Sequence, residues 1–264
     1  MFNQPGTGPE DNVEMGALTV ANMEGQTHTY IWGKEEEYYE EDRARGAKIK
    51  GVNIQMTNLK SEYKPFIIFE PGVVIDPWVG EGYSFWNHWP VAQLPNDGRV
   101  APAKDRPSHT SFSCGAPVVH NGERNSHMAV MLYGLRNEPI ERLVPLARSW
   151  NNPAELKVVE GDVESRGYDK FQRAYVLECK DGACRVELSV SGSEDSPIVN
   201  PAFVFKGWGK RSANLTLNGK KVEQGKDFRF GHRHRLEGSD LIVWVKKDST
   251  KPIKILLSPV KPPR

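Results

Sequence analysis

Residues 48–70 read KIKGVNIQMTNLKSEYKPFIIFE and carry the clearest β-strand patterns of the chain. In Lys48–Thr57, apolar residues recur at nearly alternate positions, which predicts a half-buried strand; Gly51 interrupts the alternation and indicates a bulge. In Tyr63–Glu70 the apolar residues are consecutive, which predicts a strand in a sheet that is covered on both faces. This stretch therefore favours a β fold with a sheet inside a packed core.

Strand patterns continue on both sides of this stretch, and turn residues separate them. Gly25-Gln26 and Asn218-Gly219 are typical of tight hairpin turns. No repeat of 20–50 residues appears, which argues against propellers and solenoids. The sequence predicts an all-β, antiparallel β-sandwich of jelly-roll or supersandwich type with very little helix. Further strands are expected at Ala17–Met23, Thr27–Trp32, Val73–Val79, His109–Ser113, Pro117–His120, Ser126–Tyr133, Ala154–Glu160, Lys170–Cys179, Cys184–Val190, Ala202–Trp208, Ala213–Leu217, Asp227–Gly231, Leu241–Lys246 and Ile253–Leu257.

Two segments are ambiguous between helix and extended chain. Glu138–Trp150 has apolar residues at helical spacing, but Pro145 falls among them. Proline removes a helical donor and clashes with the preceding turn, so we expect Arg142–Trp150 to be extended and edge-like. Lys34–Arg45 has an acidic half before a basic half; we expect a solvated charged loop, and a short helix is the open alternative.

A length of 264 residues is enough for one large β domain, or a large one and a small one. Residues 1–15 are expected to be disordered or loosely attached, because they offer little apolar surface to bury. From Pro201 the expected strands are short and closely spaced. This change predicts a large sandwich over 16–195 and a smaller C-terminal β region over 196–264. The alternative is one double sheet that continues across this boundary.

The formal net charge of +1 creates no field over the whole molecule that would attract nucleic acid, although local basic patches are compatible with it. No apolar run approaches the roughly 20 residues that span a bilayer. No signal peptide is visible in the N-terminal sequence MFNQPGTGPEDN. We expect a secreted or periplasmic location within a longer, multidomain parent protein.

The chain has three cysteines. Cys179 and Cys184 flank Lys180–Ala183, which is typical of a hairpin turn, so a disulfide across the hairpin and two free thiols are equally open. Cys114 stands alone and is expected to be buried. No CxxC pair exists, and neither a metal nor another cofactor is expected.

The candidate site lies in the proline-rich segment 82–113, where aromatic, histidine and arginine side chains concentrate. Indole faces stack on pyranose rings while neighbouring polar groups bind hydroxyls, so this composition favours a glycan site. In the alternative, a tryptophan anchors the core and the arginines tie the loop to backbone carbonyls. The residues expected to bind substrate are Trp86, Asn87, Trp89, Arg106 and His127.

The same segment also contains the residue types that β-elimination of a uronate requires. The carboxylate must be neutralised, a base must remove the C5 proton, and an acid must protonate the leaving oxygen. Arg99 is the candidate for the first task, His88 or His109 for the second, and Tyr83 for the third. Whether the protein is an enzyme stays open, and a polysaccharide lyase is the enzymatic hypothesis.

A basic run, Arg229–Arg235, includes His232-Arg233-His234. On a strand the two histidines would share one face and could form a metal pair, but no third ligand is evident. We interpret the run as an exposed basic strand, which could line a groove for an acidic polymer. The chain contains no GxSxG, P-loop, HExxH or EF-hand motif.

Four phrases, GVNIQMTNLKSEYKPFIIFEPG (51–72), SFWNHWPVAQLPNDGR (84–99), RPSHTSFS (106–113) and NPAFVFKGWG (200–209), resemble β-sandwich portions of bacterial polysaccharide-degrading proteins. Polysaccharide lyases and their accessory domains are the nearest class. The resemblance implies a carbohydrate-engaging sandwich. It transfers no catalytic residue, because the jelly-roll signatures of alginate lyases are absent. A structural domain that docks onto another domain, or onto a second copy in a homodimer, is a further alternative.

Overall fold

The computed structural model describes residues 2–3, 17–31, 49–57, 64–71, 75–80, 109–114 and 130–260. These residues are mostly β-strand, and most strand pairs are antiparallel, which confirms the prediction of an all-β, sandwich-like fold with very little helix. The chain divides into two compact units, residues 1–147 and 148–264. The predicted boundary near residue 195 lies instead inside the second unit.

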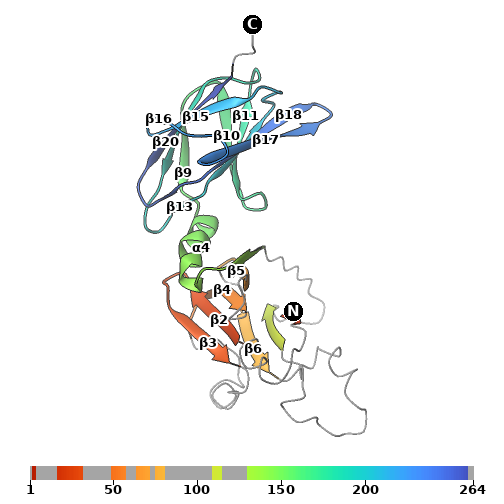
Figure 1. Cartoon of the computed structure of the whole chain (residues 1–264), viewed down its shortest axis with the longest axis vertical. Helices are drawn as coiled ribbons and strands as arrows, with labels where there is room; N and C mark the ends of the chain where they lie inside the picture. The colour runs from red at the N-terminus through yellow and green to blue at the C-terminus, as the bar shows by residue number, and fades with distance from the viewer. Residues whose placement is uncertain are drawn as a thin grey trace, which may run out of the picture. The chain divides into compact units, whose positions relative to one another are not determined.

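The described part of the first unit contains a five-stranded antiparallel sheet in the order β3-β2-β4-β5-β8 and a three-stranded sheet in the order β1-β7-β6 (Figure 1). Ile54, Ile68 and Phe69 are completely buried in the larger sheet, as the apolar run in the opening stretch predicted. The strands are β1 (Phe2–Asn3), β2 (Ala17–Asn22), β3 (Thr27–Ile31), β4 (Val52–Thr57), β5 (Lys64–Phe69), β6 (Ile75–Gly80), β7 (His109–Cys114) and β8 (Met131–Arg136).

The strands and turns of the first unit agree with some of the sequence predictions and differ from others. The hairpin turn between β2 and β3 is confirmed; Gly25 has a φ of 89°, and its amide donates to the carbonyl of Asn22. Phe2–Asn3, within the segment predicted to be loosely attached, pair with β7 instead. The strand predicted over Ser126–Tyr133 overlaps β8, which begins at Met131, and residues 126–129 lie outside the described residues. The rest of residues 1–15, Lys34–Arg45 and Pro117–His120 lie outside the described residues.

The prediction of an extended segment over Arg142–Trp150 is wrong. The chain forms a 3-10 turn, η2 (Ile140–Leu143), followed by helix α4 (Val144–Asn151). Pro145 is the second residue of α4, where the backbone N–H would have no helical acceptor, so the proline costs no hydrogen bond there. The apolar residues at helical spacing, among them Leu146 and Ala147, are buried as an amphipathic helix requires.

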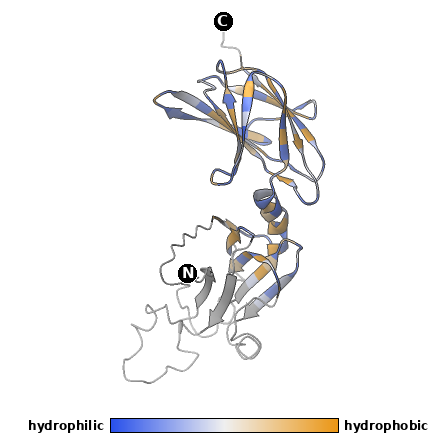
Figure 2. Cartoon of the chain, turned by 180° about the vertical axis from the view of Figure 1, so that it is seen from behind, coloured by the Kyte–Doolittle hydropathy of each residue, from blue (hydrophilic) through white to orange (hydrophobic). Residues whose placement is uncertain are grey.

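The second unit is a sandwich of two five-stranded sheets, in the orders β10-β11-β14-β18-β17 and β16-β15-β20-β12-β9, with a small two-stranded sheet, β13-β19 (Figure 1). Apolar residues (orange in Figure 2) occur throughout its strands, and those of both sheets form one large core, while Ala174, Val176 and Val204 form a smaller buried cluster. The strands are β9 (Glu155–Glu160), β10 (Val163–Asp169), β11 (Ala174–Cys179), β12 (Val186–Ser191), β13 (Ile198–Val199), β14 (Ala202–Lys206), β15 (Ala213–Leu217), β16 (Lys220–Lys221), β17 (Phe228–Arg235), β18 (Gly238–Val245), β19 (Asp248–Ser249) and β20 (Ile253–Pro259).

Strand pairing explains why no domain boundary falls near residue 195. β11 pairs with β14, and β12 pairs with β20, so strands from before and after this position share both sheets. The second unit therefore agrees with the alternative prediction, in which one double sheet continues across residue 195. Asn218-Gly219 forms the predicted tight turn between β15 and β16, with φ of 50° and 79°, as a two-residue type I′ hairpin turn requires.

The predicted hairpin between Cys179 and Cys184 is wrong. β11, which ends at Cys179, lies in one sheet, and β12, which follows Cys184, lies in the other. The turn residues between the cysteines carry the chain across the sandwich instead of reversing it within one sheet. Both cysteines are free thiols in the structure.

Candidate anion-binding site

Most of the site predicted in segment 82–113 lies outside the described residues. The backbone of His109 is described; it opens β7 and is paired opposite Asn3 and Gly80. Whether the predicted residues converge therefore stays a prediction. Those outside the described ranges are Tyr83, Trp86, Asn87, His88, Trp89, Arg99, Arg106 and His127.

In the second unit, the basic run predicted from sequence forms part of the hairpin of β17 and β18, which we call the basic hairpin (residues 226–247). Strand alternation places Phe228, Phe230, His232 and His234 on the face of β17 that packs toward the core, and their rings follow one another at centroid distances of 6.2, 6.1 and 6.3 Å. The prediction that the two histidines share a face is confirmed. The arginines of β17 occupy the opposite face.

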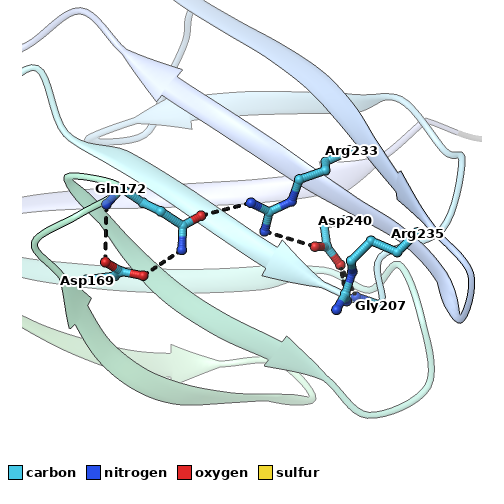
Figure 3. Close-up of polar contacts among 6 residues, drawn as sticks. All are labelled: Asp169, Gln172, Gly207, Arg233, Arg235 and Asp240. Atoms are coloured by element: carbon cyan, nitrogen blue, oxygen red, sulfur yellow. Dashed lines mark hydrogen bonds and ion pairs between the residues drawn. The ribbon is translucent and has the colours of Figure 1, made fainter.

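The outer face of the hairpin is organised around Asp240, whose side chain is completely buried. It accepts hydrogen bonds from Arg235 Nη2 at 2.6 Å, from Arg233 Nη2 at 3.1 Å and from the Gly207 amide at 3.1 Å (Figure 3). Both arginine side chains stay 41% exposed, whereas the carboxylate is 0% exposed. A carboxylate fixed in the protein thus holds two guanidinium groups at the surface.

These partners keep Asp240 ionised. Burial alone would raise the pKa of this carboxyl, but the Gly207 amide and the arginines Arg235 and Arg233 bring the pKa below its ordinary value. Hydrogen bonds and opposite charges both favour the charged form, and here they outweigh desolvation.

Arg233 also connects the hairpin to the turn between β10 and β11. Its Nη1 donates to Gln172 Oε1 at 3.0 Å, and Figure 3 shows the side chain extending between Gln172 and Asp240. Asp169 fixes Gln172 in turn, since its carboxylate accepts from the Gln172 side-chain amide at 2.6 Å and from the backbone amides of Phe171 and Gln172 at 2.9 and 3.1 Å. The hydrogen bond with the Gln172 side chain is the main reason that the pKa of Asp169 is lowered.

The two guanidinium groups have donors to spare. A guanidinium carries five N–H donors. Among the described residues, two guanidinium nitrogens of Arg233 and one of Arg235 donate hydrogen bonds. A planar, permanently charged group with unused N–H donors at the surface is suited to a carboxylate or a sulfate, which it can bind through two hydrogen bonds.

The division of the chain reveals a charge asymmetry that the net charge of the whole chain conceals. Residues 148–264 carry 22 basic and 15 acidic residues, a formal charge of +7, whereas residues 1–147 carry 13 and 19, a formal charge of −6. Within the basic hairpin, residues 226–247, six basic residues stand against three acidic ones. The second unit therefore has the charge that attracts an anionic ligand.

The histidines of the hairpin are engaged in hydrogen bonds. His232 Nε2 lies 3.1 Å from the carbonyl oxygen of Arg211, and His234 Nδ1 lies 2.7 Å from Ser239 Oγ. In the part of the chain that the structure describes, no group of three or more His, Cys, Asp or Glu residues could hold a metal ion.

The basic run was predicted from the sequence, but Asp240, Gln172 and Phe171 were not. The position of Asp240 beside the arginines could have been predicted from the register of the β17–β18 hairpin. A two-residue turn at Leu236-Glu237 pairs Arg235 with Gly238, and this places Asp240 directly opposite Arg233. Nothing in the sequence indicates that Gln172 reaches Arg233, because these residues are 61 positions apart and meet only through the sheet.

The chain matches no protein-family model, and no similar protein was found among curated proteins or solved structures. The helical segments of the described residues include none with the length and hydropathy of a membrane-spanning helix.

Proposed function

We propose that this is a carbohydrate-engaging β-sandwich protein whose second unit binds an acidic polysaccharide at Arg233 and Arg235. One observation carries the proposal: buried Asp240 fixes two exposed guanidinium groups side by side in a unit of formal charge +7. Because the two guanidinium groups are already fixed, binding a ligand carboxylate costs the protein little conformational entropy, and this favours binding.

The resemblance to polysaccharide-degrading proteins supports a glycan as the anionic ligand, since one of its phrases, residues 200–209, contains β14, the strand beside the basic hairpin. Uronic acids carry the carboxylates that arginine binds through two hydrogen bonds. Segment 82–113 is proposed as a second glycan-contacting region. We further propose a secreted or periplasmic location within a longer parent protein, in keeping with an extracellular polysaccharide ligand.

The experiment is a titration of the full chain with polygalacturonate, with neutral dextran as the comparison polymer. The test variant combines Arg233→Gln, Arg235→Gln and Asp240→Asn, so that no carboxylate is left buried without its partners. Lys220→Gln is the matched control, because it changes the net charge by the same amount on an exposed strand of the other sheet.

The triple variant should bind polygalacturonate about tenfold to a hundredfold more weakly, since hydrogen bonds to charged groups contribute about 1.5–3 kcal/mol each and solvent exposure reduces this. Lys220→Gln should bind within about twofold of the wild type, because a distant exposed charge is screened by salt. Arg233→Lys with Arg235→Lys keeps the charge but loses the fork of donors, so its affinity should fall between the two.

The proposal is wrong if a folded triple variant, verified by circular dichroism, binds as tightly as the wild type. It is also wrong if the wild-type chain binds a single-stranded DNA oligonucleotide more tightly than any uronate polymer at the same salt concentration, since the ligand class would then be nucleic acid.

A further inference from the structure

Phe171 is exposed to an unusual degree for an aromatic residue. Its side chain lies in the turn between β10 and β11, and the residue is 76% exposed. Phenylalanine is normally among the more buried residues, because exposing its ring to water forfeits the hydrophobic stabilisation that burial would give.

The turn that carries Phe171 is held in a fixed shape. The carboxylate of Asp169 accepts from the Phe171 amide at 2.9 Å and also binds both the backbone and the side-chain amide of Gln172. The ring is therefore displayed from an ordered turn, which lowers the entropy that a ligand would have to overcome when it packs against the ring.

Phe171 is linked to Arg233 through the residue that follows it, Gln172. Gln172 follows Phe171 in the chain, one Cα–Cα step of about 3.8 Å away. Its side-chain oxygen accepts a hydrogen bond from Arg233 Nη1 at 3.0 Å (Figure 3). The turn and the basic hairpin thus bring an exposed aromatic ring, an amide and an exposed guanidinium to one region of the second unit.

We infer that Phe171, Gln172 and Arg233 form a subsite for a uronate residue of a polysaccharide chain. The apolar face of the pyranose stacks on the Phe171 ring, the carboxylate binds the unused donors of Arg233, and a hydroxyl group accepts the one side-chain N–H of Gln172 that does not bind Asp169. This inference rests on the proposed function and deepens it, because the stacking ring distinguishes a sugar acid from an anion of any other kind.

The test compares two polyanions, polygalacturonate and poly-L-glutamate, which both carry carboxylates but of which only the first has pyranose rings. The variant is Phe171→Ala in the full chain. Leu236→Ala is the matched control, because Leu236 is another exposed apolar residue of the second unit and lies in the turn beside Arg235. Phe171→Trp keeps a stacking surface and should restore binding.

Phe171→Ala should weaken binding of polygalacturonate about five- to tenfold, the effect of one aromatic contact, and leave the weaker binding of poly-L-glutamate unchanged. Leu236→Ala should change neither affinity. Equal affinity of wild type and Phe171→Ala for polygalacturonate would overturn the subsite, as would equal losses for both polymers. Either result would leave the proposed function unaffected. The proposed function fails if replacing Arg233 and Arg235 does not change the affinity for polygalacturonate.

Discussion

The substitution Asp240→Asn tests whether the buried carboxylate organises the basic hairpin. Asparagine has nearly the same shape as aspartate, so the change removes a charge and one acceptor without opening a cavity. The Asp240 carboxylate is completely buried and bound by Arg233, Arg235 and the Gly207 amide. In the variant, the amide nitrogen of asparagine faces at least one of these donors, and the two guanidinium groups lose their counter-charge.

The magnitude follows from burial. Removing one partner of a fully buried ion pair costs about 3–5 kcal/mol. Here the guanidinium groups are 41% exposed and can regain water contacts when the carboxylate is lost, so part of that cost disappears. We expect Asp240→Asn to lower the free energy of unfolding of the second unit by about 2–3 kcal/mol at pH 7.

The effect should depend on pH. The pKa of Asp240 is lower in the folded protein than its ordinary value, so its ionisation stabilises the fold above the unfolded-state pKa of about 4. This stabilisation is lost as the pH falls through the folded-state pKa. The asparagine variant has no such titration, so the difference in stability between wild type and variant should shrink from pH 7 toward pH 3.

Urea denaturation at several pH values measures this difference, and hydrogen exchange at the Gly207 amide reports the local contact. Asp195→Asn, which neutralises an exposed carboxylate of the same unit, is the control and should change stability by less than about 0.5 kcal/mol. An Asp240→Asn variant as stable as the wild type at pH 7, or a difference that does not vary with pH, would refute this account of the cluster.

Two further predictions concern the second unit. Burial raises the pKa of Cys179 to about 12, so iodoacetamide at pH 8 should modify the partly exposed Cys184 first, as peptide mass spectrometry would show; equal labelling of the two would contradict the structure. Gly161→Ala should destabilise the unit by about 2–4 kcal/mol, because φ is 118° and a Cβ would lie 2.6 Å from the Arg185 carbonyl oxygen. Gly209→Ala, with a φ of 87° but open space around it, should cost only about 1 kcal/mol in thermal unfolding; equal losses for the two glycines would refute the steric argument.

Strand positions were predictable from the sequence wherever a strand buries one face or both. β5 and β15 were expected within a residue of where they lie, because their apolar patterns and the Asn218-Gly219 turn are strong local features. β10 was missed because most of its residues are exposed, so its sequence has little apolar alternation. α4 was missed because the effect of a proline depends on its place in the helix, and Pro145 lies in the first turn.

Pairing between distant segments was less predictable than strand position. The turn between Cys179 and Cys184 is typical of a hairpin, yet β11 pairs with β14, in parallel, and β12 pairs with β20. A local turn pattern cannot show whether the chain reverses in one sheet or crosses to the other, because that depends on which surfaces must be buried together. The candidate site illustrates the same limit, since Arg233 meets Gln172 only through the assembled sheet.

The most direct test of the proposed function is an NMR titration of the full chain with a short galacturonate oligomer, in which the side-chain Nε–H resonances of the arginines are followed. We predict that the resonances of Arg233 and Arg235 shift in a saturable way with increasing oligomer. Arg166, whose exposed guanidinium already binds Glu164 and Glu178, should not shift. Saturable shifts that leave Arg233 and Arg235 unchanged would contradict the assignment of the glycan site to the basic hairpin.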